Sequence, residues 1–269
     1  MRNKNVDIFT PLPRDLEFID GAHMVVAGST KGGPGKSSTI ITAAGVCSHL
    51  DLQYIVASYD QSNTTLERCL GAGSVTILDA QTPELARSTL AAVMTVAKKN
   101  RAIVLLDLPG AMNTKESALL ENIQKARLIE DFESLYMVCP VSPDAEELEG
   151  ACAAIKIFQP DQVLIRARRP SKYCSDFPDF VKPWTYLKEF PIWECEQWSK
   201  TIKDIYDHTG RFSHLPPVPK LKSYLTANFG KLSMGEEKDI EDVLLHVDAA
   251  ARPIYEHLFA NITTKKPKS

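Results

Sequence analysis

Short apolar runs alternate along the first part of the chain with longer stretches whose apolar residues recur at helical spacing. Continuous apolar runs are typical of strands that are buried on both faces of a parallel sheet. Their alternation with helices predicts an α/β fold, a doubly wound, mostly parallel sheet flanked by helices. The expected strands are Met24–Ala27, Tyr54–Ala57, Ile103–Leu106, Leu135–Cys139 and Val163–Ile165, and the expected helices lie near 36–49, 83–98, 115–128 and 144–158.

The pattern loosens after residue 166. Residues 170–194 are rich in proline, a helix is expected near 195–207, and a proline-rich bend follows at 215–220. The last stretch has apolar residues at helical spacing, and Pro253 must kink or restart this helix. We interpret the apolar stripe as core packing rather than as a membrane-binding face, because the polar face is acidic. The stripe is formed by positions 240, 243, 244, 247, 250, 254 and 258, and the acidic residues are Glu241, Asp242, Asp248 and Glu256.

Composition narrows the classes of function. A chain of 269 residues with 44% apolar residues can bury one sizeable core. A net charge of −3 and a pI near 6.1 argue against a protein that coats nucleic acid through its overall field, so DNA contact would need a local basic patch. The N-terminus lacks a signal-peptide pattern and no apolar run approaches membrane-spanning length, so we expect a cytoplasmic protein. The six scattered cysteines, without a Cys-x-x-Cys pair, indicate reduced and mostly buried thiols rather than a disulfide or zinc framework.

The segment GSTKGGPGKSSTI, residues 28–40, lies between the first expected strand and the first expected helix. Glycines allow backbone N–H groups to converge on a polyphosphate at a helix N-terminus. Gly35, Lys36 and Ser37 match the end of the phosphate-loop pattern G-x-x-x-x-G-K-[ST], and Thr30 replaces its first glycine. Lys36 is expected to reach the β- and γ-phosphates and the Ser37 hydroxyl to bind Mg²⁺. A glycine-rich turn without a ligand would not need a lysine followed by a hydroxyl.

KGGPGKS, residues 31–37, resembles the deviant Walker A motif K-G-G-x-G-K-[ST] of the ParA/MinD family of P-loop ATPases, and it matches every specified position. The resemblance implies a P-loop NTPase fold, ATP and Mg²⁺ as cofactors, and a face-to-face homodimer. In that dimer Lys31 would reach the phosphates held by the partner subunit and act like an arginine finger. The implied nucleotide contacts are Lys31, Gly32, Gly33, Pro34, Gly35, Lys36, Ser37, Ser38, Gly110 and Arg166.

Two later segments resemble the switches of the same family. ASYDQSNTT, residues 57–65, resembles switch I, D-x-D-P-Q-x-N-x-T, with Ser58 in place of the first aspartate and without the proline. Asp60 is the candidate that orients the attacking water, although a carboxylate at a strand end could instead cap the next helix. LLDLPGA, residues 105–111, resembles switch II, so Asp107 would hold Mg²⁺ through water and the Gly110 amide would face the γ-phosphate. The implied metal site is therefore Ser37, Asp60 and Asp107.

The resemblance covers about residues 22–165, including CPVSPDAEELEGA at 139–151, and it suggests a compact plasmid-type member. The family often reads the base with an asparagine where this chain has Arg166, Arg168 and Arg169. These arginines could stack on a purine, bind phosphate or form a solvated basic turn. We divide the chain into an N-terminal extension (1–20), a single ATPase domain (21–262) and a basic tail (263–269). Within the domain, 22–165 is the nucleotide-binding core and 166–262 a helical and loop part.

The leading hypothesis is an ATPase switch with weak intrinsic activity, in which Lys31, Lys36 and Asp60 are the catalytic residues. ATP would form a dimer that binds a surface, and hydrolysis stimulated by a ParB-like or other adaptor would release it, for plasmid or DNA segregation or positioning. The surface would be non-specific DNA, which would make the protein nucleoid-associated when ATP is bound, with no integral membrane association. Candidate DNA contacts are Arg166, Arg168, Arg169, Lys172, Lys220, Lys222 and Lys231.

Two alternatives remain open. The incomplete switch I favours a nucleotide-gated scaffold or filament with little turnover. A metabolic ATP-dependent ligase on the same fold would need a substrate pocket, for which residues 170–230 are the region left unassigned. The tryptophans of that region, Trp184, Trp193 and Trp198, are more typical of core anchors than of a ligand cage. The scattered cysteines disfavour an iron–sulfur variant.

Overall fold

The computed structural model describes residues 16–30, 35–61, 64–71, 73–110, 114–126, 133–167, 178–194 and 252–265. Its main sheet has seven strands in the order β4-β3-β5-β2-β6-β7-β8, and every neighbouring pair is parallel. The doubly wound sheet expected from the sequence is therefore confirmed. The strands are β2 (His23–Ala27), β3 (Tyr54–Ser58), β4 (Val75–Ile77), β5 (Ile103–Asp107), β6 (Ser134–Val141), β7 (Gln162–Ala167) and β8 (Ile192–Glu194).

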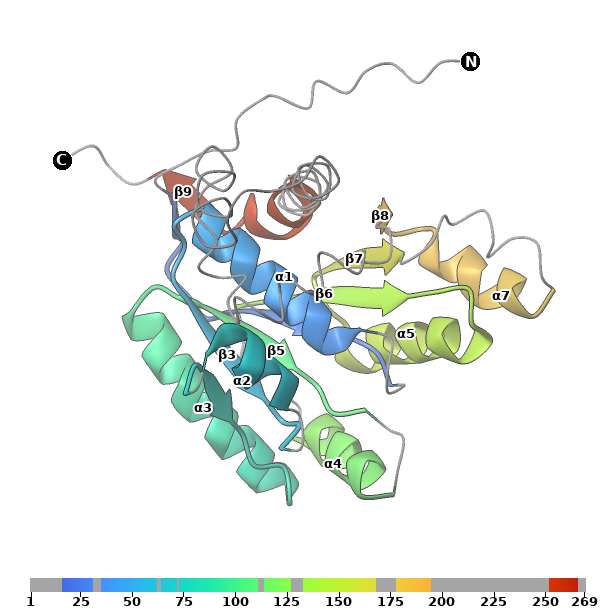
Figure 1. Ribbon diagram of the computed structural model, residues 1–269, viewed down its shortest axis with the longest axis horizontal. Helices are drawn as coiled ribbons and strands as arrows, with labels where there is room; N and C mark the ends of the chain where they lie inside the picture. The colour runs from blue at the N-terminus through green and yellow to red at the C-terminus, as the bar shows by residue number, and fades with distance from the viewer. Residues whose placement is uncertain are drawn as a thin grey trace, which may run out of the picture.

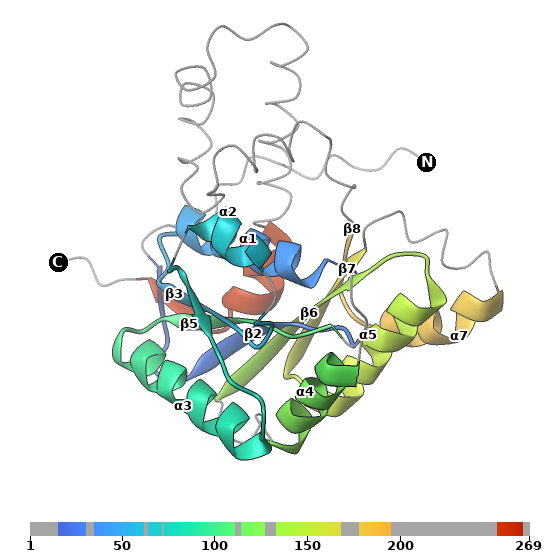
Figure 2. The same ribbon diagram turned by 60° about the horizontal axis from the view of Figure 1, so that its bottom comes forward.

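Helices cover both faces of this sheet (Figures 1 and 2). Because successive side chains of a strand point to opposite faces, Val25 and Ala27 of β2 pack in one apolar cluster while Met24 and Val26 pack in the other. The first cluster contains α1 (Lys36–His49), α2 (Thr64–Leu70) and the π-helix η3 (Tyr255–Phe259), and the second contains α3 (Pro83–Lys99), α4 (Thr114–Lys125), α5 (Ala145–Phe158) and α7 (Pro178–Leu187).

Local signals account for where two helices begin. The Thr82 side chain caps α3 by accepting from the Leu85 N–H at 3.2 Å, and Pro83 takes the first helical position, where no N–H is needed. Asp144 caps α5 in the same way, accepting from the Glu147 N–H at 3.0 Å. The helix expected at 36–49 has these bounds as α1, whereas α2, β4, α7 and β8 were not expected.

Two segments that the sequence analysis placed outside the domain are packed elements. β1 (Leu16–Phe18) pairs antiparallel with β9 (Thr263–Lys265) in a separate two-stranded sheet. Leu16 and Phe18 are buried in the α1-side cluster, where the Phe18 ring meets the Phe259 ring edge-on at 5.9 Å between centroids. The expected extension (1–20) and tail (263–269) therefore each contain part of the packed structure.

The C-terminal apolar stripe contributes to the core where the structure describes it. Ile254 and Leu258 are buried in the α1-side cluster, which agrees with the core interpretation. Pro253 lies in the helical turn 252–254 that leads into η3. The stripe positions from 240 to 250, the helix expected near 195–207 and the bend at 215–220 lie outside the described residues.

The described residues also bear on cysteine chemistry. Cys47, Cys139 and Cys152 are free and buried, as expected for reduced thiols, and burial raises the pKa of each thiol.

The described part of the chain has no group of three His, Cys, Asp or Glu side chains arranged to hold a metal ion. Over the same ranges, no helix has both the length and the apolar character needed to cross a membrane.

Substitution Phe18→Ala tests whether β1 belongs to the folded domain. We expect it to lower the free energy of unfolding by about 3–5 kcal/mol, because it removes a buried ring from a packed cluster. Urea denaturation followed by circular dichroism measures the change. Ile19→Ala is the control, since the Ile19 side chain is 43% exposed and its loss should cost less than about 1 kcal/mol. Equal effects of the two substitutions would contradict the packing of β1.

Candidate functional site

The carboxyl ends of three central strands meet beside α1. In the parallel register, Asp107 at the end of β5 lies opposite Ala27 of β2 on one side and Ser58 of β3 on the other. Open α/β sheets bind their ligands in the crevice outside the carboxyl ends of such strands. The loop that follows β2 leads directly into α1, which runs back over the sheet (Figure 2).

The start of this loop is held against β6 and α5. The Gly28 N–H donates to the Val138 carbonyl at 2.9 Å, and the Thr30 N–H donates to the Gly150 carbonyl at 3.4 Å. A Cβ atom on Gly28 would lie 2.3 Å from the Met137 sulfur, so a larger residue here would force the Met137 side chain to move. Gly150 belongs to the 139–151 segment that resembles the ParA/MinD pattern. The predicted contacts Lys31, Gly32, Gly33 and Pro34 lie outside the described residues.

The first turn of α1 is suited to an anion. Gly35 precedes the helix with a left-handed φ of 98°, and Lys36, the first helical residue, is buried. The N-terminus of α1 has no side-chain cap and no acidic residue in its first turn. Its first N–H groups and the positive end of the helix dipole therefore face the position where the sequence predicts a phosphate group.

Ser37 and Asp107 come together at this edge. The Ser37 hydroxyl donates to Asp107 Oδ2 at 2.9 Å, and Asp107 is only 1% exposed. A hydroxyl and a carboxylate oxygen are the hard donors that Mg²⁺ prefers, often with waters completing the coordination. These two residues therefore fit the cation that the sequence resemblance implies.

Asp60 lies on the same edge, at the end of β3. The Tyr59 N–H donates to the Asp107 carbonyl at 3.1 Å, which attaches the turn carrying Asp60 to β5. The Ser58 hydroxyl accepts from the Asp60 N–H at 3.1 Å and thereby supports this turn. Ser58 therefore has a structural contact at the position where the switch I pattern has its first aspartate. Gly110 follows β5 and is partly buried.

The structure places Arg166 differently from the sequence-based expectation. It is only 3% exposed in β7, so its assignments to a DNA-contacting surface and to a solvated basic turn are wrong. Its Nη1 donates to Thr39 Oγ1 at 2.9 Å and to Ser38 Oγ at 3.2 Å, and its guanidinium lies 5.1 Å from the Trp193 ring centroid. The remaining DNA candidates, Arg168, Arg169, Lys172, Lys220, Lys222 and Lys231, lie outside the described residues.

Sequence reasoning missed the contact between Arg166 and Thr39. The available signal was strand alternation: Arg166 follows Leu164 by two positions and so shares its face, and Leu164 packs in the α1-side cluster. Trp184 and Trp193 are both buried in the core, as expected for anchors, and Trp198 lies outside the described residues.

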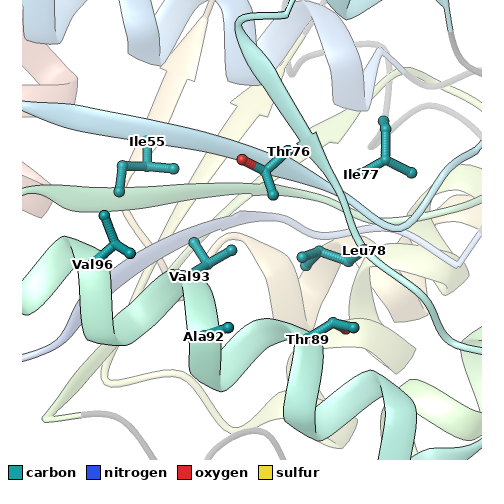
Figure 3. A pocket seen from close by; sticks show the side chains of 8 residues that line it. All are labelled: Ile55, Thr76, Ile77, Leu78, Thr89, Ala92, Val93 and Val96. Carbon is teal, nitrogen blue, oxygen red and sulfur yellow. The ribbon is translucent and has the colours of Figure 1, made fainter.

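A separate hollow of about 380 Å³ lies between the sheet edge and α3 (Figure 3). Apart from two threonines, the side chains around it are apolar, and none belongs to the predicted nucleotide site. The hollow therefore offers no charged group for a phosphate. Its lining residues are Ile55 on β3, Thr76 and Ile77 on β4, Leu78 directly after β4, and Thr89, Ala92, Val93 and Val96 on α3.

Comparison with known proteins establishes the fold. No protein-family model matches the sequence, and no curated protein is similar to it. The structure is similar to the MinC:MinD cell division protein complex of Aquifex aeolicus, with a TM-score of 0.53 and 12% identity over 92% of this chain and 99% of that one. It is also similar to the MinD cell division protein of Aquifex aeolicus, with a TM-score of 0.51 and 12% identity over 88% and 98% of the two chains. At this identity the likeness shows a shared P-loop NTPase fold.

Magnesium dependence tests the pairing of Ser37 with Asp107. We expect Ser37→Ala and Asp107→Asn to reduce the gain in ADP affinity that Mg²⁺ provides by about 10- to 100-fold, because each removes an oxygen donor or its partner. Calorimetric titration of ADP with Mg²⁺ and with EDTA measures this gain. Ser48→Ala removes a hydroxyl near the opposite end of α1 and serves as the control. A Mg²⁺ effect of wild-type size in both site variants would contradict the assignment.

Proposed function

We propose that this protein is an ATPase of the ParA/MinD type that works as a nucleotide-controlled switch. The observation that carries the proposal is the hydrogen bond between Ser37 and Asp107, which brings the phosphate-loop residue and the switch II residue to one edge of the sheet. The deviant Walker motif at residues 31–37 supports ATP rather than an unrelated anion as the ligand. ATP binding would drive dimerisation, and slow hydrolysis would reverse it.

The chain supplies separate groups for binding and for hydrolysis in this proposal. The first-turn amides of α1 and Lys36 would bind the phosphates, and Mg²⁺ held by Ser37 and Asp107 would neutralise phosphate charge. Lys31 would add positive charge at the phosphates of the partner subunit, where charge develops during transfer. Asp60, on the turn attached to β5, would orient the attacking water.

For the biological role we propose the positioning or segregation of a cargo. The fold supports this proposal because it is similar to that of the MinD cell division protein, one of whose structures is a complex with MinC. By analogy, we propose that an adaptor protein recognises the ATP-bound dimer of this chain and stimulates hydrolysis. For the surface on which the dimer acts we propose DNA, as in a plasmid partition system.

A scaffold with little turnover is the second candidate, and one observation favours it. Ser58 replaces the first switch I aspartate, and its buried hydroxyl is hydrogen-bonded to the turn of Asp60. A site with one carboxylate fewer would bind ATP while hydrolysing it slowly. Measurement of phosphate release with and without DNA separates the two candidates, because a scaffold would bind ATP tightly and release almost no phosphate.

Oligomeric state tests the switch. With ATP we expect light scattering to detect a dimer in the wild type, no dimer in Lys36→Ala and a persistent dimer in Asp60→Ala. Lys31→Ala should lower the hydrolysis rate by about 10²–10³-fold, because it removes charge from the transition state. Lys98→Ala is the control, since this lysine forms an exposed ion pair with Glu133 at 3.2 Å. Absence of an ATP-dependent dimer in the wild type would contradict the switch.

DNA binding is tested separately by fluorescence anisotropy with duplex DNA at two salt concentrations. We expect the ATP-bound dimer to bind duplex DNA, and we expect its affinity for DNA to fall steeply as the salt concentration rises. Each phosphate contact contributes about 0.9 to the slope of log K against log salt concentration. Arg168→Ala and Lys172→Ala should each reduce that slope. A dimer that is indifferent to DNA would contradict DNA as the surface and leave the nucleotide switch in place.

A further inference from the structure

Arg166 is a buried cation that makes contact with the helix following the phosphate loop. It lies in β7, more than 120 residues away in sequence from its partners on α1. Stacking on the Trp193 ring holds the guanidinium from the β8 side. None of the roles in the proposed mechanism uses this arginine, although it contacts the first turn of the helix that begins at Lys36.

The contacts of Arg166 converge on the carbonyl of Gly35. Its Nη1 donates to the hydroxyls of Ser38 and Thr39. Each of these hydroxyls donates in turn to the Gly35 carbonyl, at 2.8 Å from Ser38 and at 2.9 Å from Thr39. The Thr39 N–H donates to the same oxygen at 3.0 Å. Arg166 therefore orients two of the three donors that hold this carbonyl.

The held carbonyl determines where the adjacent N–H points. In a planar trans peptide the C=O of Gly35 and the N–H of Lys36 point in opposite directions. Anchoring the carbonyl toward α1 therefore directs the Lys36 N–H away from the helix, toward the loop. Gly35 has a left-handed backbone, and the three donors that hold its carbonyl together fix the orientation of this peptide.

Charge adds to this geometry. A guanidinium remains protonated in proteins, and Arg166 lies beside the positive end of the α1 dipole. Two positive contributions at one buried position raise the local potential and favour an anion bound at the first turn. Hydrogen bonds in a chain also polarise one another, which strengthens the relay from Arg166 through the hydroxyls.

We propose that Arg166 is a positioning residue for nucleotide phosphate, acting through Ser38 and Thr39 on the Gly35–Lys36 peptide. It raises phosphate affinity by preorganising the Gly35–Lys36 peptide at the first turn of α1 and does not contact the nucleotide itself. This inference rests on the proposed function, because it takes the ligand to be a Mg²⁺–nucleotide. A purely structural arginine would instead support the packing of β7, α1 and Trp193 without affecting affinity.

The test compares MgADP affinity in the wild type, Arg166→Lys and Arg166→Met by calorimetric titration, with thermal unfolding of the nucleotide-free proteins in parallel. MgADP is the probe because its binding requires neither dimerisation nor hydrolysis. We expect Arg166→Met to lower affinity about tenfold and Arg166→Lys to lower it less, because lysine restores the charge without the planar fork. Arg101→Lys alters an ion-paired arginine near the amino-terminal end of β5, far along the strand from the site. This control variant should bind MgADP with wild-type affinity.

A double-mutant cycle separates the relay from a general loss of stability. Thr39→Val removes the hydroxyl and keeps the shape of the side chain, and we expect it to lower MgADP affinity as well. If Arg166 acts through Thr39, the two substitutions combined cost less than the sum of their separate effects. If Arg166→Met does not fold, the cycle is built with Arg166→Lys.

The outcomes distinguish the inference from the function on which it rests. Wild-type MgADP affinity in Arg166→Met and Arg166→Lys, or additive effects in the cycle, would overturn the positioning role. A wild-type protein that binds no MgADP, or binds it equally well after Lys36→Ala, would overturn the proposed function instead.

Discussion

The site depends on the register that sets Asp107 between the ends of β2 and β3. This register places the Asp107 carboxylate where the Ser37 hydroxyl reaches it at 2.9 Å, and it places the Asp107 carbonyl where it accepts from Tyr59. A slip of one residue in either pairing would turn the Asp107 side chain to the opposite face of the sheet. Ser37, Asp60 and Asp107 therefore lie at one edge of the sheet because three buried strands end together.

Close packing around the loop supports the same arrangement. Gly28 approaches β6 so closely that any side chain would collide with Met137, while the Thr30 N–H reaches Gly150 on α5. These contacts join the beginning of the loop to segments more than 100 residues later in the chain. The loop thus begins from residues that are hydrogen-bonded to β6 and α5.

Arg166 is a buried cation that packs beside an apolar cluster. The α1-side cluster is apolar, yet β7 brings Arg166 beside it, where Ser38, Thr39 and Trp193 contact the guanidinium. Burial of a cation costs free energy unless hydrogen bonds and local charge compensate for it. Its location beside the first turn of α1 is consistent with the anion site proposed at this helix end.

The sequence by itself determined the elements and residues whose signals are local. Continuous apolar runs located β2, β3, β5, β6 and β7, and helical spacing located α1, α3, α4 and α5. The order Gly35, Lys36, Ser37 predicts a phosphate loop at the start of α1. Tertiary structure decided the rest. Strands as short as β1, β4, β8 and β9 acquire their conformation from pairing with neighbours rather than from a pattern of their own. Likewise, Arg166 had three possible roles in the sequence, and the placement of β7 between β6 and β8 brought it against hydroxyls 127 and 128 residues away.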